Sequence, residues 1–275
     1  MRLLKISFTL VGLFLIVFFL MLVNYTGYAV REDTELERIE NATQKSKGLI
    51  SFSFDDGLLS YYTKVYPAMK ASGLNGTVYV IANWTENDGK FEGRELMDFP
   101  HMREMENQGW EIASHGVKHK RMTNLSDEEL DEELRLSKII LEKNGLKITN
   151  IAFPYGHFDD RTVNAAGEYY STVRPLFLGY NEKENIDWFR LRSRWIMSGN
   201  YHGDVCGWIS YAKEKDFWLI LTFHNIEENK STQWDTSLYD FNEIIKCTVE
   251  MNLPVKTIRE VAEDYKNLND SLKLN

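Results

Sequence analysis

The chain has 275 residues, of which 43% are hydrophobic and 13% aromatic. A chain of this length and composition can hold one large domain that buries roughly 70–75% of its unfolded surface, which excludes disorder of the whole chain. Its formal net charge of −9 at pH 7 would repel a phosphate backbone, so no nucleic acid is expected as a partner.

Residues 1–30 have the features of a membrane-inserting segment. Arg2 and Lys5 precede an uninterrupted apolar stretch from about Phe8 to Val23, whose length as a helix is close to the thickness of a hydrocarbon core. This favours an uncleaved signal anchor. A cleaved signal peptide stays open, because Gly27-Tyr28-Ala29 offers the small residues that a signal peptidase reads. In both interpretations the rest of the chain is extracytoplasmic, either membrane-anchored or secreted.

The remaining chain divides into a polar linker at 31–47, a domain at 48–268 and a short tail at 269–275. In the domain, short apolar runs alternate with amphipathic segments, the pattern of β-α units around a parallel sheet. About seven such units in a chain of this size favour a distorted (β/α) barrel with about seven parallel strands over an open doubly wound sheet. Strands are predicted at 49–54, 77–81, 111–114, 150–153, 171–173, 217–223 and around Val255.

Two helices are clearly marked. Ser126 and Glu129 form a capping-box pattern at the start of the first helix, which we expect to end at Gly145. A second helix, from Ile258 to about Leu268, is expected to close the domain. The cysteines, Cys206 and Cys247, lack the C-x-x-C spacing of a metal or redox site, so a disulfide and two buried thiols both stay open.

Polar residues follow three of the predicted strands. Asp55-Asp56 follows the strand at 49–54, His115 and His119 follow the strand at 111–114, and His224 follows the strand at 217–223. The C-terminal ends of barrel strands gather at one rim, so these side chains should meet. Each signal alone is weak. Adjacent aspartates are typical of turns, and two histidines on one face of a helical turn need a further ligand to hold a metal.

Together these residues permit amide hydrolysis. Two histidines and one carboxylate make a three-ligand site with open positions, as in catalytic sites for zinc or a similar divalent ion. The second aspartate could take a proton from water whose pKa the ion has lowered, while a histidine across the site protonates the leaving amine.

The same residues resemble the motifs of the polysaccharide deacetylase family, with its NodB homology domain of the carbohydrate esterase family 4 type. The resemblance spans about Leu49 to Tyr265 and consists of five motifs in matching order. The motifs are Ser53-Phe54-Asp55-Asp56-Gly57 for T-F-D-D-G, Trp110 to Ser114 for the lead-in strand, His115 and His119 for H-[ST]-x-x-H, Phe153-Pro154-Tyr155-Gly156 for R-x-P-Y, and Leu221 to His224 for L-x-x-H.

The resemblance implies a role for each residue: Asp55 as general base, His224 as general acid, Asp56, His115 and His119 as metal ligands, and Pro154 and Tyr155 as groove residues. The Tyr155 backbone N–H would help bind the oxyanion. The implied fold is a distorted barrel with fewer than eight strands. The implied activity is removal of N-acetyl groups from an N-acetylglucosamine-type polymer. The implied cofactor is one divalent ion, with Zn²⁺ preferred over other divalent ions.

One motif departs from the family pattern. Ala152 stands where the family has an arginine that is thought to orient and tune the catalytic aspartate. Arg174, after the strand at 171–173, is the candidate replacement, with a surface arginine before Pro175 as the alternative and Arg194 as another source. Asp187-Trp188 could supply a further family motif, although the stretch from Asp187 to Arg194 also fits a strand with alternating faces.

The leading hypothesis is therefore an exported, membrane-tethered N-deacetylase with an acetylated glycan as substrate. Two rivals stay open: a related hydrolase acting on another C–N bond, such as a small cyclic amide, and a glycan-binding module whose active site has decayed. Export argues against the first, and retention of both aspartates and all three histidines argues against the second. A two-histidine, one-carboxylate iron oxygenase fits less well, because Asp55 and His224 suit hydrolysis.

Three tryptophans are candidate sugar-stacking residues: Trp84, Trp218 and Trp234.

Overall fold

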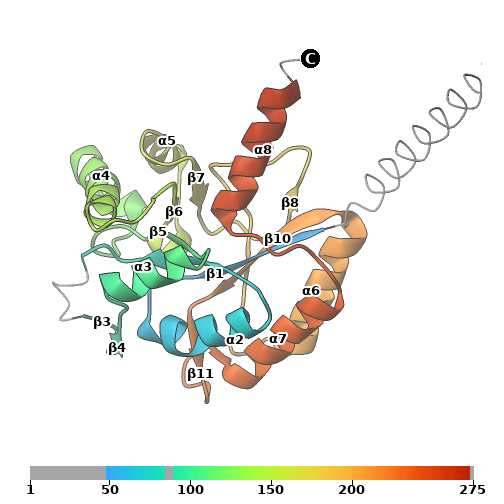
Figure 1. The fold of residues 1–275 in the computed structure, drawn as a ribbon. Coiled ribbons are helices and arrows are strands. Elements are labelled where there is room, and N and C mark those ends of the chain that lie inside the picture. Colours follow the sequence, from blue (N-terminus) through green and yellow to red (C-terminus); the bar gives the residue numbers. More distant parts are fainter. Residues whose placement is uncertain (1–47, 84–88, 273–275) are drawn as a thin grey trace, which may run out of the picture. The chain divides into compact units, whose positions relative to one another are not determined.

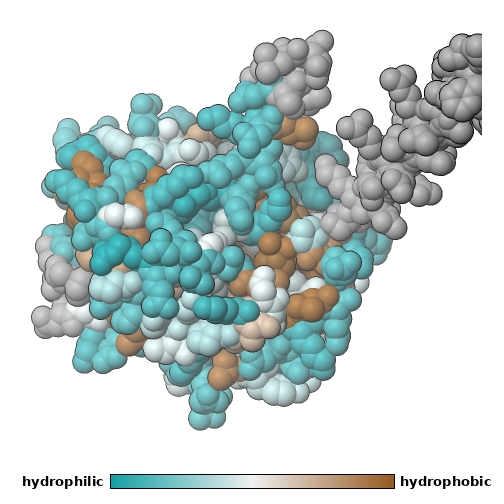
Figure 2. Space-filling model, viewed as in Figure 1, coloured by the Kyte–Doolittle hydropathy of each residue, from teal (hydrophilic) through white to brown (hydrophobic). Residues whose placement is uncertain are grey.

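The computed structural model describes residues 48–83 and 89–272, which belong to the unit Ser46–Asn275. The predicted membrane segment at 1–30, the linker at 31–47 and Trp84 lie outside the described residues. No helix in the two described stretches is long and apolar enough to cross a membrane. The face in Figure 2 carries mainly hydrophilic side chains, interrupted by small hydrophobic areas.

The helices and strands alternate along the chain, as the β-α pattern predicts. In chain order they are β1 (Leu49–Phe54), η1 (Tyr61–Val65), α2 (Tyr66–Ala71), β2 (Thr77–Val80), β3 (Lys90–Phe91), β4 (Arg94–Glu95), α3 (Phe99–Asn107), β5 (Glu111–Ser114), η3 (Met122–Asn124), α4 (Asp127–Lys143), β6 (Asn150–Ala152), η4 (Pro154–Gly156), α5 (Asp160–Gly167), β7 (Thr172–Arg174), β8 (Asn181–Glu182), β9 (Arg194–Trp195), α6 (His202–Lys215), β10 (Phe217–Phe223), β11 (Asn225–Glu227), β12 (Asp235–Ser237), α7 (Leu238–Glu250) and α8 (Ile258–Leu272).

One sheet organises the described residues, with the strand order β7-β6-β5-β2-β1-β10-β8 and with β9 beside β10 (Figure 1). All pairings in it are parallel except that of β8 with β10. The predicted α/β fold with a curled parallel sheet is confirmed, but the sheet is an incomplete half-barrel. Within the described residues β7 and β8 are not paired, and the gap is partly spanned by hydrogen bonds of Val173 with Trp188 (2.8 Å) and Leu191 (3.1 Å).

Strand β1 shows how the two faces of the sheet are used. Ile50, Phe52 and Phe54 pack with the helices in the larger hydrophobic core. The alternate residue Leu49 belongs to a second, smaller core inside the half-barrel, together with Trp218 of β10. Because successive side chains of a strand point to opposite faces, the six buried residues of β1 can serve both cores.

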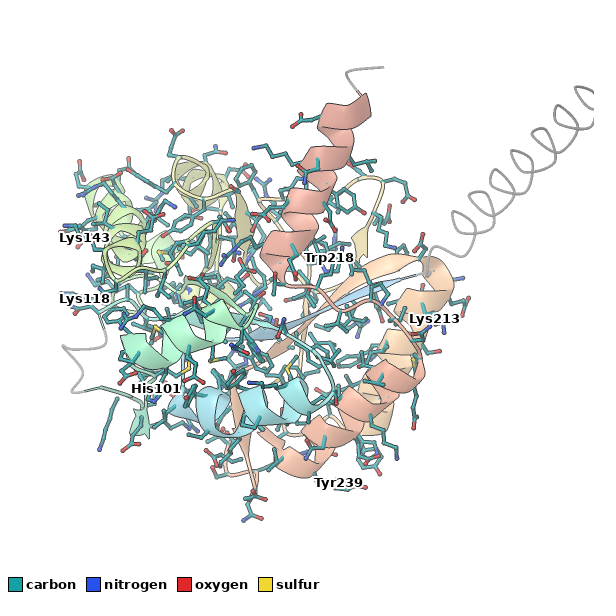
Figure 3. The ribbon with its side chains drawn as sticks, viewed as in Figure 1. His101, Lys118, Lys143, Lys213, Trp218 and Tyr239 are labelled. Atoms are coloured by element: carbon teal, nitrogen blue, oxygen red, sulfur yellow. A yellow bond between two sulfur atoms is a disulfide. The ribbon has the colours of Figure 1, made fainter. Side chains whose placement is uncertain are left out.

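Helix α8 covers the N-terminal ends of the strands. The backbone N–H groups of Ile258 and Arg259 donate to side chains of the first residues of β2 and β5, Thr77 (3.0 Å) and Glu111 (2.8 Å). Ile258 packs in the inner core with Trp218, which Figure 3 shows beside α8. The helix extends to Leu272, beyond the predicted end at Leu268, because no glycine or proline stops it there.

Helix α4 confirms the predicted capping box. The Ser126 N–H donates to the Glu129 carboxylate (3.0 Å), and the Glu129 N–H donates to the Ser126 hydroxyl (3.3 Å). The helix ends at Lys143, and Gly145 follows with a φ of 85°. A left-handed backbone at this point favours glycine, which explains why the helix stops where the sequence indicates.

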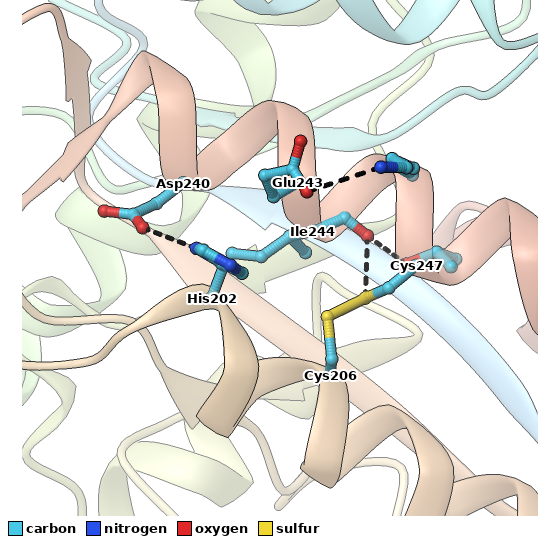
Figure 4. The surroundings of a disulfide bond; sticks show 8 residues. His202, Cys206, Asp240, Glu243, Ile244 and Cys247 are labelled. Carbon is cyan, nitrogen blue, oxygen red and sulfur yellow. Dashed lines mark hydrogen bonds and ion pairs between the residues drawn. A yellow bond between two sulfur atoms is a disulfide. The ribbon is translucent and has the colours of Figure 1, made fainter.

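A disulfide bond between Cys206 and Cys247 joins helices α6 and α7 (Figure 4). The same two helices are connected by His202, whose Nδ1 lies 3.0 Å from the Asp240 carboxylate. Of the two states that the sequence left open for the cysteines, the structure has the disulfide.

We expect removal of this disulfide to destabilise the domain by about 2–4 kcal/mol, because the cross-link restricts the unfolded chain. The measurement is urea unfolding of the wild-type protein with and without reductant. The Cys206→Ser/Cys247→Ser variant is the control, because its unfolding midpoint should not respond to reductant. A wild-type midpoint that is also independent of reductant would contradict a stabilising role for the bond.

Candidate functional site

The structure brings the predicted polar residues together at the C-terminal ends of the strands. Asp55 and Asp56 follow β1, His115 and His119 follow β5, and His224 follows β10. All five line one cavity of about 340 Å³. These residues are up to 169 positions apart in the chain (224 − 55), so the parallel pairing of β1 with β10 and with β2, and of β2 with β5, is what places them side by side.

Asp56, His115 and His119 form a cluster whose donor atoms all lie within 4.8 Å of one another. The Nε2 atom of His115 is 3.5 Å from Asp56 Oδ1, and the Nε2 atom of His119 is 3.3 Å from the same oxygen. The three side chains are buried or nearly so. Two imidazoles and one carboxylate at this spacing are a donor set that fits a catalytic divalent ion.

The His115 ring is fixed by a hydrogen bond on its far side. Its Nδ1 lies 2.9 Å from the carbonyl oxygen of Ala152 on the neighbouring strand β6. A carbonyl can only accept, so Nδ1 carries a proton and Nε2 is the ring nitrogen that faces Asp56. Metal-binding histidines are commonly held in this way.

The segment from His115 to His119 is a loop, so the expected helical turn is wrong. Gly116 and His119 have positive φ angles of 77° and 52°, which a right-handed helix does not permit. Glu133 of α4 holds the loop instead, accepting hydrogen bonds from the N–H groups of Val117 (2.8 Å) and Lys118 (3.1 Å). The sequence analysis missed Glu133, although a charged residue within the buried leucine stripe of α4 was the available signal.

Arg174 contacts the predicted base directly: its guanidinium donates to Asp55 Oδ1. Arg174 lies within β7 and is only 2% exposed, so it is not a surface arginine. It pairs in register with Ala152, the position at which the family arginine is missing. Paired residues of neighbouring strands point to the same face, so Arg174 reaches the space that Ala152 leaves. One guanidinium nitrogen makes this contact, and the guanidinium also lies 4.7 Å from the centre of the Tyr79 ring.

Arg194 does not approach Asp55. Its guanidinium stacks on Tyr180 and Trp208, at 4.9 and 4.7 Å from the ring centres, and it lines a separate cavity of about 800 Å³.

Tyr61, which the sequence did not indicate, connects the loops of the predicted base and acid. Its hydroxyl lies 2.7 Å from the carbonyl oxygen of Asp55 and also contacts the carbonyl oxygen of His224. Tyr61 is fully buried and begins the short π-helical segment η1. Such segments are often found at functional sites, because their wider turn redirects a side chain.

The groove motif places Tyr155 at the cavity. Tyr155 is 50% exposed, has a φ of 60°, and its ring centre lies 4.6 Å from that of His119. Gly156 also lines the cavity, with a φ of 69° and with Leu176 so close that a Cβ would clash. Pro154 is buried and does not line it.

Of the expected tryptophans, only one described residue reaches the cavity. Trp234 lines it, whereas Trp218 is fully buried in the inner core. Asp187-Trp188 lies elsewhere: Trp188 packs on Trp218 and Tyr265, and Asp187 pairs with Arg190. Trp195, which the sequence analysis missed, lines the cavity with its ring 5.3 Å from that of His224.

Comparison with known proteins agrees with this geometry. Residues 42–173 match the sequence model of the family described as polysaccharide deacetylase. The matched stretch is just under half of this chain, and the family is one of hydrolases. YxkH of Bacillus subtilis (strain 168), a homologue named for this family, is 28% identical over 123 residues. That match covers 44% of this chain and 42% of the length of YxkH.

Solved structures share the fold of this chain. The Xyl-CE4 domain of a multidomain xylanase from the hindgut metagenome of Trinervitermes trinervoides has a TM-score of 0.56 at 16% identity, covering 80% of this chain and 92% of that domain. A mutant of the peptidoglycan deacetylase PdaC from Bacillus subtilis has a TM-score of 0.54 at 18% identity, covering 83% and 96%. A CE4 family pseudoenzyme from Bacillus anthracis has a TM-score of 0.53 at 14% identity, covering 78% and 66%. Proteins named as a deacetylase and as a pseudoenzyme both carry this fold, so activity must be argued from the site.

Burial and neighbouring charges oppose each other in their effect on the pKa of both proton-transfer candidates. Burial would raise the pKa of Asp55, but the charges of Arg174, and then of His115 and His224, outweigh it and hold that pKa below its usual value. Burial lowers the pKa of His224, although the Asp55 carboxylate, 3.7 Å from its Nε2, opposes the shift. The Nδ1 atom of His224 is buried without a hydrogen-bond partner among the described residues.

Because a base must be ionised to accept a proton, Arg174→Ala should move the acidic limb of the pH–rate profile to higher pH. Removing the nearby cation raises the pKa of Asp55, so protonation inactivates the base at a higher pH. Arg174→Lys should lower kcat more than it raises KM, because lysine lacks the planar fork of arginine.

Acetate release measured across pH checks this expectation. Arg194→Ala is the matched control, because Arg194 lies in the other cavity and its loss should leave the acidic limb in place. If Arg174→Ala kept both the turnover and the acidic limb of the wild type, Asp55 would work without an arginine partner.

Proposed function

We propose that this chain is a metal-dependent N-deacetylase that removes acetyl groups from an amino-sugar polymer outside the cytoplasmic membrane. The observation that carries the proposal is that one cavity holds both a candidate metal site and two candidate proton-transfer groups. Asp56, His115 and His119 offer a metal-ligand set, and Asp55 and His224 lie beside it, with neighbouring charges that keep Asp55 ionised. A carbohydrate-binding module would need neither function.

The cluster of Asp56, His115 and His119 would hold the divalent ion, for which we propose Zn²⁺. Imidazole and carboxylate donors suit it, and the Ala152 carbonyl binds the Nδ1 proton of His115, so that the neutral ring has Nε2 as its ligand atom. When bound, such an ion supplies Lewis acidity, which polarises a carbonyl and lowers the pKa of water.

The chain's own groups perform the proton transfers and hold the reacting atoms. Asp55, kept ionised by Arg174, takes a proton from the attacking water. The Tyr155 N–H donates to the oxygen of the tetrahedral intermediate. His224 then gives a proton to the amine nitrogen as the C–N bond breaks, which releases acetate and a free amino sugar.

The proposed location outside the cytoplasmic membrane has two supports. The Cys206–Cys247 disulfide suits an oxidising compartment, since thiols stay reduced in the cytosol. Arg2 and Lys5 before the apolar residues favour an inside position for the extreme N-terminus.

If the domain lies outside the cytoplasmic membrane, added protease should cleave it on intact cells whose outer layers have been made permeable. Protection of the domain, while an exposed control protein is cleaved, would contradict the proposed location.

The catalytic proposal is tested by acetate release from a panel of acetylated glycans, using the full-length chain with and without a chelator. We expect release from at least one N-acetylglucosamine polymer, loss of release after chelation and recovery with Zn²⁺. An enzyme that releases acetate from no glycan but opens a small cyclic amide would overturn the substrate class and favour the rival C–N hydrolase.

A further inference from the structure

Two small β structures outside the main sheet form two walls of the cavity. The antiparallel pair β3–β4 contributes Phe91, Glu92 and Arg94, and the strands β11 and β12 are joined by a loop that contributes Trp234. Figure 1 shows β3, β4 and β11 near one another below the sheet. The backbone N–H of Met97, just after β4, donates to the carbonyl of Gly57 (2.9 Å), so the first wall is attached next to the metal-ligand loop.

Asp235 organises the second wall. It is fully buried, and its carboxylate accepts hydrogen bonds from the N–H and hydroxyl groups of Ser231 (2.7 and 2.8 Å) and of Thr232 (2.7 and 2.8 Å). It also accepts from the side-chain amide of Asn225 (3.0 Å), the residue after His224. These bonds outweigh the effect of desolvation and lower the pKa of Asp235, so the carboxylate stays charged. One buried anion thus fixes the loop immediately before Trp234 and connects it to the predicted general acid.

Arg94 connects the two walls. Its guanidinium lies 3.5 Å from the Asp235 carboxylate and 3.7 Å from that of Glu92. Because Asp235 is buried, this ion pair is screened less than one on the open surface. The first wall is therefore fastened to the same carboxylate that shapes the second.

The fixed loop presents Trp234 beside the predicted acid. The Trp234 ring centre lies 5.0 Å from that of His224 and 5.9 Å from that of Trp195. The side chain is half-buried and lines the cavity, and its N–H backbone group donates to the Thr232 hydroxyl (3.2 Å). His224 delivers its proton to the amine nitrogen, so the part of the substrate on this side of the cavity is the sugar ring and not the acetyl group.

From this arrangement we infer that Trp234 is a sugar-binding platform, and that Arg94 and Asp235 are positioning residues which hold it in place. The ligand is the apolar face of an amino-sugar ring next to the reacting amide. A rigid aromatic ring contributes large contact area to such a face with little loss of conformational freedom. The inference rests on the proposed function, since it uses the side of the cavity on which His224 acts.

The test separates binding of the sugar from binding of the acetyl group. Titration calorimetry of the full-length chain uses two probes that are the proposed products, a glucosamine tetramer and acetate. Trp234→Ala should weaken binding of the tetramer roughly 3- to 10-fold and leave acetate binding unchanged. Trp234→Phe should retain most of the affinity. Arg94→Met should weaken tetramer binding in the same direction, whereas Arg161→Met, which removes an exposed ion pair with Asp127, should not change it.

Kinetics of acetate release from the N-acetylglucosamine tetramer give the second measurement. Trp234→Ala and Arg94→Met should raise KM and leave kcat within about twofold of the wild type, since neither residue transfers a proton. Urea unfolding of each variant separates a lost platform from a lost fold.

Three outcomes are decisive. Unchanged tetramer binding in Trp234→Ala overturns the platform. Weakened binding in Trp234→Ala with wild-type binding in Arg94→Met overturns the positioning role. A wild-type protein that binds the tetramer through Trp234 but releases no acetate from any glycan overturns the proposed function and leaves the sugar platform standing.

Discussion

The variant His115→Ala/His119→Ala is expected to purify without a divalent ion and to lose acetate release by roughly 10³-fold or more. Both imidazoles lie within 3.5 Å of Asp56 Oδ1, and a single carboxylate does not hold a divalent ion tightly. Loss of the Lewis acid removes several kcal/mol of transition-state stabilisation, which corresponds to this change in rate.

Metal content by elemental analysis and acetate release by enzymatic assay check the expectation together. His101→Gln is the control, because His101 lies on α3 outside the cavity and contacts Asp98 and the ring of Tyr62. The fold should persist in the double variant, since the segment around His115 is also held by Glu133. A double variant that retained stoichiometric metal would show that the ion binds elsewhere or that these histidines are not its ligands.

Asp55→Asn is expected to keep the metal and lose turnover by about 10²- to 10⁴-fold, because an amide cannot accept the proton of the attacking water. The substitution preserves the shape of the side chain but removes the charge that pairs with the buried Arg174. His224→Ala should lose turnover over a similar range while metal content stays unchanged, because the amine would leave without protonation.

The measurements are kcat, KM and metal content for both variants. Asp187→Asn serves as the matched control for the first substitution, because Asp187 is an exposed aspartate outside the site cavity. Near wild-type turnover in Asp55→Asn would remove the base role, and near wild-type turnover in His224→Ala would remove the acid role. Loss of metal from Asp55→Asn would instead identify Asp55 as a ligand.

Local sequence patterns were sufficient for the elements whose signals are short-range. The bounds of β1, β5 and β10 coincide with the predicted strands, and α4 begins with the predicted capping box. The positions of Asp55, His115 and His224 directly after three strands also followed from the sequence, because strand polarity alone sends all three to the same rim.

Local sequence patterns could not predict the interactions between distant segments. The loop geometry of His115 to His119 depends on Glu133 of α4, and the tie between the Asp55 and His224 loops depends on Tyr61. Trp218 was a candidate for stacking on a sugar, but it is buried in the core. An aromatic residue in a strand can face either the core or a cavity, and periodicity does not distinguish these two cases.

Taken by itself, the sequence determined the parallel α/β architecture, the strands that carry the chemistry and the residue types available at their ends, since propensity, period and capping act over a few residues. Only the tertiary structure decided that Arg174 stands in for the arginine absent at Ala152, because this depends on the register of β6 against β7. It also decided that the sheet stays a half-barrel, that Cys206 pairs with Cys247, and that Trp234 lies beside His224. Each of these rests on contacts between segments far apart in the chain, whose relative placement is set by packing of the whole domain and not by local preference.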